Sequence, residues 1–171
     1  MIYLGADHGG FELKKKIKLW LEEWKLVYKD LGPDKLDPAD DYPPFAFAVA
    51  QKVAEHDDMS LPWNKRPKGI LLCRSAIGVT IAANKIPNIR AGAVYDIKMA
   101  RHARCNDDVN VLCLSGDSTS ERAAKEIIKT WLDTEFSKET RHTRRINQIL
   151  DKEQSFSGGH GCEEGKCCCG D

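Results

Sequence analysis

Short apolar runs alternate with stretches of helical periodicity along the whole chain. Each apolar run has about five residues and is bounded by glycine, proline or polar residues, as buried strands are. We expect strands at residues 2–6, 26–31, 69–73, 90–94 and 109–114. Between and after them we expect helices at 10–24, 41–55, 79–85, 97–105, 121–132 and 138–150. This alternation predicts a largely parallel sheet with helices on both faces.

The expected helices have one apolar face, which is the pattern of a helix that packs on a sheet. In the first helix the outer face is lysine and glutamate, and the inner residues are Leu13, Ile17, Trp20, Leu21 and Trp24. In the helix at 121–132 the inner residues are Ala124, Ile127, Ile128, Trp131 and Leu132. The sequence therefore predicts a three-layer α/β/α, Rossmann-like domain with a five-stranded, mainly parallel sheet.

Two segments do not fit this alternation. Residues 56–68 are polar and punctuated by Pro62 and Pro67, which predicts a mobile surface loop. After Gln154 the chain is rich in glycine and cysteine and has little that could form a core, so we expect disorder there. The expected organisation is one domain over residues 1–153 followed by a tail over 154–171.

Composition limits the kind of partner that the protein can have. Its 26 basic residues balance 26 acidic ones, so no global field attracts nucleic acid or an anionic membrane. No apolar run approaches the roughly eighteen residues of a membrane span, and the first residues lack the pattern of a secretory signal. We therefore expect a cytoplasmic protein with neither nucleic acid nor a membrane as partner.

The seven cysteines do not resemble the disulfide framework of a secreted domain. Cys73, Cys105 and Cys113 are scattered in the body and four others crowd the last ten residues, so we expect reduced thiols. His160 and the tail cysteines could chelate a soft or borderline metal ion. Because their spacing is irregular, we expect opportunistic binding or none, and no metal at the functional site.

In open parallel sheets, ligands bind beyond the carboxyl ends of the strands, so polar residues just after strands are the first candidates. The first expected strand ends in Asp7-His8-Gly9-Gly10. A carboxylate and an imidazole there could bind a polyhydroxylated ligand, while the glycines let a backbone come close. The alternative is a helix cap in which Asp7 or Gly9 serves backbone N–H groups. The residues alone leave both open.

Cys73 ends the third expected strand. The turn after it opens a helix whose free N–H groups can hold an anion or a developing enediolate oxygen, and the same helix end favours a thiolate. Cys73 could then remove a proton next to a carbonyl, which is the step that interconverts aldoses and ketoses. The alternative is a buried, inert cysteine.

Basic residues crowd the last expected helix, at Arg141, His142, Arg144 and Arg145. Arg141 and Arg145 are four residues apart and share a helix face, which suits the binding of a phosphate group. The alternative is a charged face that is simply solvated.

An ordered set of short motifs runs from residue 1 to about residue 150. The motifs are Gly5-Ala6-Asp7-His8-Gly9-Gly10-Phe11, Asp41-Tyr42-Pro43, Gly69-Ile70-Leu71-Leu72-Cys73, Ile81-Ala82-Ala83-Asn84-Lys85-Ile86-Pro87, Ile89-Arg90-Ala91, Asn110-Val111-Leu112 and Arg141-His142-Thr143-Arg144-Arg145. In this order they resemble type B ribose-5-phosphate isomerases and their galactose-6-phosphate isomerase relatives. Each motif is weak alone, but the ordered set is specific.

This resemblance implies an aldose–ketose isomerase of a phosphorylated sugar, first of all ribose 5-phosphate and ribulose 5-phosphate, that works through a cis-enediol. It implies no metal or other cofactor. It also implies a homodimer, or a tetramer, with shared sites in which Arg141 and Arg145 reach in from the neighbouring subunit to bind phosphate. Two alternatives stay open: an isomerase of another sugar phosphate, as in the galactose-6-phosphate branch, and a non-catalytic sugar-phosphate-binding paralogue.

The resemblance also assigns roles to single residues. Asp7 would contact sugar hydroxyls or assist ring opening, and His8 would help to bind phosphate. Tyr42 would line the sugar pocket. Cys73 would be the enediol base, and Ser75 would stand near the reacting carbons.

The chain departs from the family pattern after the cysteine. It reads Cys73-Arg74-Ser75-Ala76-Ile77-Gly78 where the family has cysteine-glycine-threonine-glycine-x-glycine. Gly78 keeps the last glycine of this substrate-binding turn, but two others are gone. If those positions need a positive φ or a close backbone approach, Arg74 and Ala76 cost strain or space.

A second departure concerns proton transfer and charge. The family's ring-opening histidine is replaced by Asn106, which can hydrogen-bond the substrate but cannot exchange a proton at neutral pH. His102, one helical turn earlier, could share a face with Asn106 and take over proton shuttling, or it could be a surface histidine. Asp117 stands where many members have a phosphate-binding arginine, a loss that Arg74 would offset.

Overall fold

The structure is a computed structural model in which residues 1–157 are described. A single sheet forms its centre, with the strand order β2-β1-β3-β5-β4. The strands are β1 (Ile2–Ala6), β2 (Tyr28–Asp30), β3 (Lys68–Cys73), β4 (Ala91–Ala93) and β5 (Val111–Ser115). All neighbouring strands pair in parallel, which confirms the predicted sheet.

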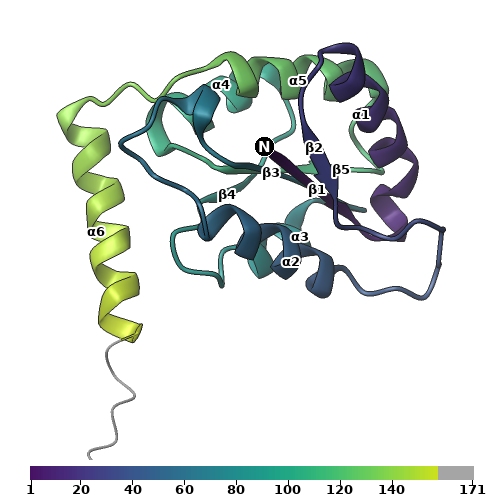
Figure 1. The fold of residues 1–171 in the computed structure, drawn as a ribbon, viewed down its shortest axis with the longest axis horizontal. Coiled ribbons are helices and arrows are strands. Elements are labelled where there is room, and N and C mark those ends of the chain that lie inside the picture. The colour runs from purple at the N-terminus through teal and green to yellow at the C-terminus, as the bar shows by residue number, and fades with distance from the viewer. Residues whose placement is uncertain (158–171) are drawn as a thin grey trace, which may run out of the picture.

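Helices cover both faces of the sheet. The α-helices are α1 (Phe11–Glu23), α2 (Tyr42–Ala54), α3 (Ile77–Ala83), α4 (Ile97–Asp107), α5 (Glu121–Asp133) and α6 (Thr140–Ser157), with short 3-10 helices η1 (His8–Gly10) and η2 (Trp63–Lys65). Figure 1 shows α1, α4 and α5 on one face and α2 and α3 on the other. Helix α6 lies beyond the β4 side of the sheet and extends away from the body. It continues through Ser157 rather than ending near residue 150.

Successive side chains of each central strand face opposite layers, as the pleat of a strand requires. Ile70 and Leu72 of β3 pack in the layer of α1 and α5, whereas Leu71 and Cys73 pack in the layer of α2 and α3. The near-continuous burial of β1, β3 and β5 is typical of strands covered on both sides. Four of the five inner residues predicted for α5 are buried, namely Ala124, Ile127, Ile128 and Trp131, and Leu132 is partly buried.

Residues 56–68 form the predicted loop with many exposed residues, but the segment is not wholly at the surface, and its mobility stays a prediction. Trp63 in this segment is only 2% exposed, and its ring packs edge-on against Trp131 with centroids 5.2 Å apart. Arg66 is also buried, at 3% exposure. Asp57, Arg66 and Lys68 are shielded from solvent by partners inside the molecule, whereas Asp58, Ser60, Asn64 and Lys65 are exposed.

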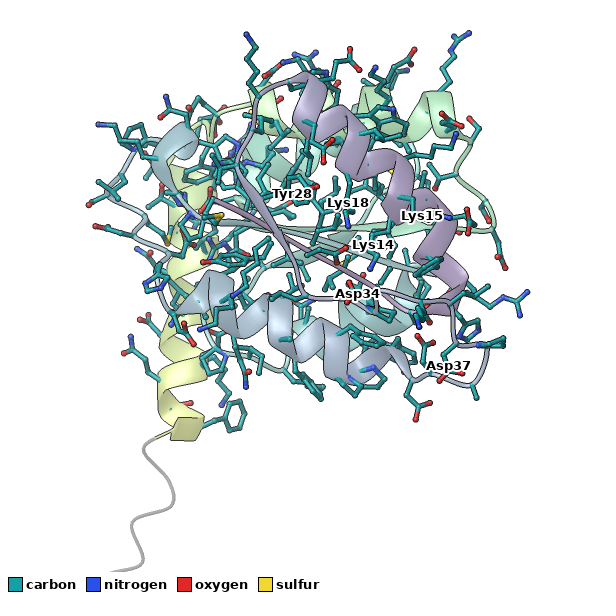
Figure 2. The ribbon with its side chains drawn as sticks, turned by 45° about the vertical axis from the view of Figure 1, so that its right-hand side comes forward. Lys14, Lys15, Lys18, Tyr28, Asp34 and Asp37 are labelled. Atoms are coloured by element: carbon teal, nitrogen blue, oxygen red, sulfur yellow. The ribbon has the colours of Figure 1, made fainter. Side chains whose placement is uncertain are left out.

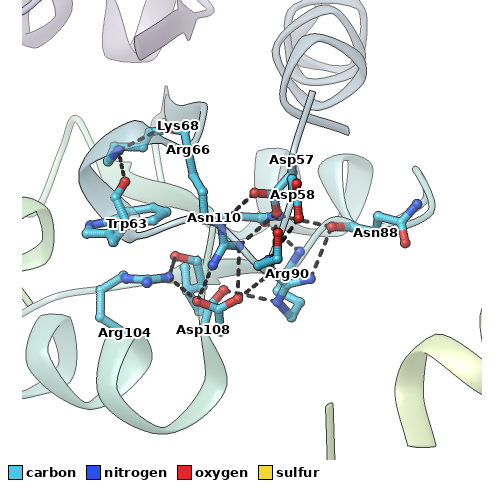
Figure 3. A network of polar contacts seen from close by, with 12 residues as sticks. Asp57, Asp58, Trp63, Arg66, Lys68, Asn88, Arg90, Arg104, Asp108 and Asn110 are labelled. Atoms are coloured by element: carbon cyan, nitrogen blue, oxygen red, sulfur yellow. Dashed lines mark hydrogen bonds and ion pairs between the residues drawn. The ribbon is translucent and has the colours of Figure 1, made fainter. Parts of the chain in front are cut away.

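These partners form a network of buried charges at the amino end of the sheet (Figure 3). Arg66 donates to both Asp57 and Asp108, with N···O distances of 2.7–3.0 Å. Arg90 and Arg104 each approach Asp108 to 2.8 Å. Burial alone would raise the pKa of Asp57, but hydrogen bonds from Arg66 and an asparagine amide hold that pKa below its usual value. The network therefore ties residues 56–68 to the start of β5.

None of the helices within residues 1–157 combines the length and the apolar character needed to cross a bilayer. Residues 158–171, with the cysteines of the expected tail, lie outside the described residues. The domain boundary near residue 153, the disorder of the tail and its metal binding therefore stay predictions.

Candidate active site

Strands β1 and β3 are neighbours in the sheet, although β2 lies between them in the chain. The connections from their carboxyl ends leave toward opposite faces, because α1 and α3 lie in different layers. Such a switch point is where open α/β sheets bind ligands. Asp7 follows β1 there and Cys73 ends β3, so the structure brings these two predicted residues to one edge.

Asp7 caps the amino end of η1, which is one of the two roles that the sequence left open. Its Oδ1 accepts the N–H groups of Gly9 at 2.9 Å and Gly10 at 3.2 Å, while Oδ2 takes part in neither bond. The side chain is buried, and this burial raises the pKa of Asp7, an effect that the Gly10 amide partly offsets. A capping role and a ligand role are compatible, because each uses a different carboxylate oxygen.

His8 is held by Asp40, a residue that the sequence reading missed. The backbone N–H and the ring Nδ1 of His8 both lie 2.8 Å from Asp40 Oδ1. This hydrogen bond raises the pKa of His8, and the nearby Asp7 charge adds to the effect. The only signal in the sequence was an aspartate just before the Asp41-Tyr42-Pro43 motif, and no local spacing connects it to residue 8.

The segment that carries Asp40 is fixed from α1. Lys14 is 2% exposed, and its Nζ donates to Asp30 Oδ1 at 3.1 Å and to Pro33 O at 2.8 Å. Lys18 Nζ reaches the other oxygen of Asp30 at 3.1 Å. Figure 2 shows both lysines facing the end of β2 and the loop after it. The expectation that the lysines of this helix all lie outward is therefore wrong for Lys14, because a carboxylate and a carbonyl satisfy its ammonium group.

The turn after Cys73 adopts the strained conformation that the sequence put in question. Ala76 has φ 66° and ψ −19°, in the left-handed region, and its side chain is fully buried. Such a residue persists only where its surroundings over-determine the backbone. Thr80 Oγ1 donates to Ala76 O at 2.8 Å, and the Tyr95 hydroxyl donates to Ser75 O at 3.0 Å.

Arg74 and Asp117, two of the departures from the family pattern, contact each other. Arg74 Nε donates to Asp117 Oδ2 at 3.2 Å, and both side chains are exposed. Arg74 also lies across Gly9, where an added Cβ would be 2.2 Å from Arg74 Cγ. The negative charge of Asp117 is therefore paired with the positive charge of Arg74.

Gly78 admits the ring of Tyr42. A Cβ on Gly78 would lie 2.7 Å from Tyr42 Cζ, so the ring packs directly on this glycine. Tyr42 is the first residue of α2 and is 36% exposed, which leaves part of the ring open to a ligand. The absence of a side chain on Gly78 thus makes room for the ring of Tyr42.

The remaining predicted residues lie on α4 and α6. Asn106 Nδ2 is 2.8 Å from His102 Nε2, so the two share a helix face as expected. His102 and Arg145 line an apolar groove of about 750 Å³ between β4, α4 and α6. Arg141 is exposed and pairs with Glu139 at 2.9 Å.

One chain does not bring these two groups together. Asn106 lies in the last turn of α4, which leads into the amino end of β5, whereas Cys73 is at the carboxyl end of the adjacent β3. Strands of this length separate their two ends by roughly 16 Å. Arg145 lies on α6, beyond the edge of the sheet. Within one chain, the predicted site residues therefore form two separate groups.

Within residues 1–157, no three His, Cys, Asp or Glu side chains gather as ligands of a metal ion. Cys113, which lies near Cys73 in the α2 and α3 layer, has its pKa raised to about 12 by complete burial. A thiol with this pKa stays protonated at neutral pH, so it is not a candidate nucleophile or base.

The protein is a Rossmann-like α/β protein with a carboxylate, an imidazole and a thiol near the switch point of its sheet. These are groups that can carry out acid–base chemistry on a small polar ligand. The chain belongs to the ribose/galactose isomerase family, whose model matches residues 2–149. The resemblance inferred from the motifs is confirmed.

Individual relatives agree with this assignment. The chain is 40% identical to a probable ribose-5-phosphate isomerase B of Mycoplasma pneumoniae, over 90% of this chain and 95% of the relative. It matches the crystal structure of ribose-5-phosphate isomerase B from Mycoplasma genitalium with bound ribulose-5-phosphate at a TM-score of 0.81 and 38% identity, covering 90% and 95% of the two chains. It matches type B ribose 5-phosphate isomerase from Trypanosoma cruzi at a TM-score of 0.81 and 36% identity, covering 91% and 97%.

Proposed function

We propose that the chain is an aldose–ketose isomerase that interconverts ribose 5-phosphate and ribulose 5-phosphate. The names of its relatives support this pair of substrates, as does the ligand in the Mycoplasma genitalium structure. The observation that carries the proposal is the position of Cys73 at the end of β3, beside the Asp7 that follows β1. A base and a carboxylate at one switch point are what proton transfer next to a carbonyl requires.

In this mechanism, the Cys73 thiolate removes the proton from C2 of the open-chain aldose, and the electron pair passes to the carbonyl as a cis-enediol forms. The Cys73 thiol, which can exchange its proton with solvent, then gives a proton to C1. A proton passes from O2 to O1 as O2 becomes the ketone oxygen, so the reaction is neutral in electrons and protons. Cys73 is 4% exposed, which limits access of bulk water to the reacting carbons. In this proposal the Ser75 hydroxyl would hydrogen-bond the developing enediol, and Tyr42 would pack against the sugar.

The proposed assembly is a homodimer with shared sites. Cys73, Asp7 and His8 of one copy would bind the sugar, while α4 and α6 of the second copy would supply the other groups, namely His102, Asn106, Arg141 and Arg145. The split of these residues over one chain supports this arrangement, as does the apolar groove along α6. In this role Arg141 and Arg145 would bind the phosphate from one helix face.

Turnover of ribose 5-phosphate by the full chain tests the function directly. Cys73→Ala should lower kcat by about 100- to 10,000-fold, because a positioned base typically contributes that much, while ribulose 5-phosphate binding is retained. Cys105→Ala is the matched control, since Cys105 lies on α4 and should leave turnover unchanged. Unchanged turnover in Cys73→Ala would contradict the mechanism. Turnover of a galactose-type hexose phosphate alone would favour the other branch of the family, and binding without any turnover would favour a non-catalytic role.

A further inference from the structure

Ribose 5-phosphate is mostly a closed furanose in water, with its ring oxygen O4 bonded to C1. Cys73 can remove the C2 proton only after this ring has opened, because the closed form has no carbonyl to accept the electron pair. Ring opening needs an acid for O4 and a base for the hydroxyl on C1. An enzyme with the proposed function therefore needs a second acid–base pair besides Cys73.

His8 and Asp40 have the geometry of such an acid and its positioning residue. Two N–H groups of His8, one from the backbone and one from the ring, converge on the single oxygen Oδ1 of Asp40 at 2.8 Å each. They fix both the place of the residue and the plane of its ring. Nδ1 is used in this bond, so Nε2 is the ring nitrogen left for a ligand, on a side chain that is 30% exposed.

The charge of Asp40 favours the protonated form of His8. The Asp40 side chain is 10% exposed, and its Oδ2 is buried with no hydrogen-bond partner among residues 1–157. A carboxylate in this setting is stabilised by a positive partner, and His8 is the one ion pair that the described chain gives it. The charged groups facing His8 are Asp7 on its own segment and Asp40 on the loop before α2. Arg74, across Gly9, is engaged by Asp117.

We propose that His8, oriented by Asp40, is the acid that opens the sugar ring, and that Asp7 is the base. The proposal rests on the isomerase function proposed above. His8 Nε2 gives its proton to O4 as the C1–O4 bond breaks, and O4 keeps the electron pair of that bond. Asp7 Oδ2 takes the proton of the hydroxyl on C1, whose electrons form the C1 carbonyl. One proton is lost and one gained, so nothing is oxidised or reduced.

The raised pKa values of both groups suit these roles, since they favour the protonated form of His8 and make Asp7 a better proton acceptor. His102 is the competing acid. It lies on α4, and its ring nitrogens contact the Asn106 amide instead of a carboxylate. Within residues 1–157, no hydrogen bond joins His102 to a carboxylate that would orient its ring.

Two reactions of the full chain separate ring opening from the enediol step. Turnover of ribose 5-phosphate includes ring opening. Ribulose 5-phosphate cannot form a five-membered ring, because its C5 oxygen carries the phosphate. Uptake of deuterium from D2O at C1 of ribulose 5-phosphate therefore reports the enediol step alone.

Asp40→Asn and His8→Asn are the test variants. Asp37→Asn is the matched control in the same loop (Figure 2), where the Asp37 carboxylate accepts the Ala39 N–H and makes no contact with His8. Asparagine at position 8 keeps a donor for Asp40 but cannot transfer a proton, so this variant keeps the local fold. Both test variants should lower turnover of ribose 5-phosphate at least ~10-fold while deuterium uptake stays within about threefold of the unmodified chain. Asp37→Asn should leave both rates unchanged.

Three results would overturn the inference alone: unchanged turnover in both test variants, a parallel fall of turnover and deuterium uptake in variants with an unchanged Tm, or a selective loss of turnover in His102→Asn but not in His8→Asn. If the unmodified chain catalyses neither reaction, the proposed function itself fails, and the inference fails with it.

Discussion

Glycines let the ends of β1, β3 and β5 approach within backbone contact around the site. A Cβ on Gly116, just after β5, would lie 1.9 Å from Gly9 O, and one on Gly10 would lie 2.3 Å from Leu72 Cβ. These atoms belong to the backbone or to its first side-chain carbon, so no rotamer change can relieve the contact. The relative positions of Asp7 and Cys73 therefore depend on glycine at positions 10 and 116, where there is no room for a side chain.

Gly116→Ala should lower the free energy of unfolding by at least about 2 kcal/mol, because the new methyl group would force two backbone segments apart. It should also lower turnover, since Gly9 and Gly10 carry the hydrogen bonds to Asp7. Gly92→Ala is the control: its Cβ would meet only the two methyl groups of Val109, at 3.3 and 3.6 Å, and it should cost less than about 1 kcal/mol. Urea denaturation measures both, and equal stability of the two variants would contradict the close approach.

Lys68 is a buried cation at the first position of β3. Its Nζ donates to Trp63 O and Arg66 O, and it lies 4.2 Å from the centroid of the Trp63 ring. Burial lowers the pKa of Lys68 to about 8 in the folded chain, helped by Arg104 and Arg66. Between this value and the usual 10.5, the unfolded chain binds more protons than the folded one, so stability rises with pH.

The unmodified protein should therefore become more stable between pH 8 and 9.5, by at most about 1.4 kcal/mol per pH unit from this one group. Lys68→Met, which fills a similar volume without a charge, should flatten this rise. Thermal or urea unfolding at several pH values measures the slope. The same slope in both proteins would show that Lys68 does not titrate in this range.

At the scale of elements, the charge network fixes the connection from α2 to β3. Asp108 has a left-handed backbone, with φ 48° and ψ 40°, and its carboxylate is fully buried among the guanidinium groups of Arg66, Arg90 and Arg104. Because Arg66 also binds Asp57, the network joins the segment before β3 to the segment before β5. The start of β3, and through it the position of Cys73, is thereby set.

Asp108→Asn should lower the free energy of unfolding by about 3 to 5 kcal/mol, because it leaves buried guanidinium groups without their counter-charge. Asparagine tolerates the left-handed backbone, so strain does not contribute. Asp58→Asn, one residue from the network and exposed, should have a far smaller effect, since the hydrogen bonds of its carboxylate are with the neighbouring Ser60. Chemical denaturation compares the two. A small loss in Asp108→Asn would mean that the network is solvated.

At the scale of the whole molecule, the predicted site residues lie in two separate groups, one at the sheet and one on α4 and α6. Cys73 and Asp7 lie at the carboxyl edge of the sheet, whereas Asn106 and Arg145 lie on α4 and α6. Helix α6 extends from the body with Ile149 half exposed, beside the apolar groove. In a two-fold dimer, a group that lies far from the site of its own chain can reach the site of the partner.

Mixing Cys73→Ala with Arg145→Ala chains should therefore restore activity that neither variant has alone. In a hybrid dimer, one site has both mutations and the other has neither, so random pairing restores about a quarter of the sites. Dissociation and reassembly of tagged chains, followed by purification of hybrids, measures this. Purified hybrids that stay inactive would contradict the shared site.

The sequence by itself determined the order and kind of the elements, because periodicity and turn residues act over short distances. The strand over residues 2–6 and the inner face of α5 are as predicted, and the motifs around Asp7 and Cys73 identified the family. These features depend on neighbours in the chain or on patterns that many relatives share. The strain at Ala76 could also be predicted, because alanine stands in a turn where the family has glycine.

Only the tertiary structure decided which polar residues are buried and with which partners. Asp40 meets His8, Lys14 meets Asp30, and the segment with Arg66 enters the core. Local sequence marks such residues as polar, and polar residues are usually solvated. They can be buried because an ion pair with an opposite charge offsets the cost of removing each charge from water. The fold brings that partner from a distant part of the chain, so local sequence does not reveal it.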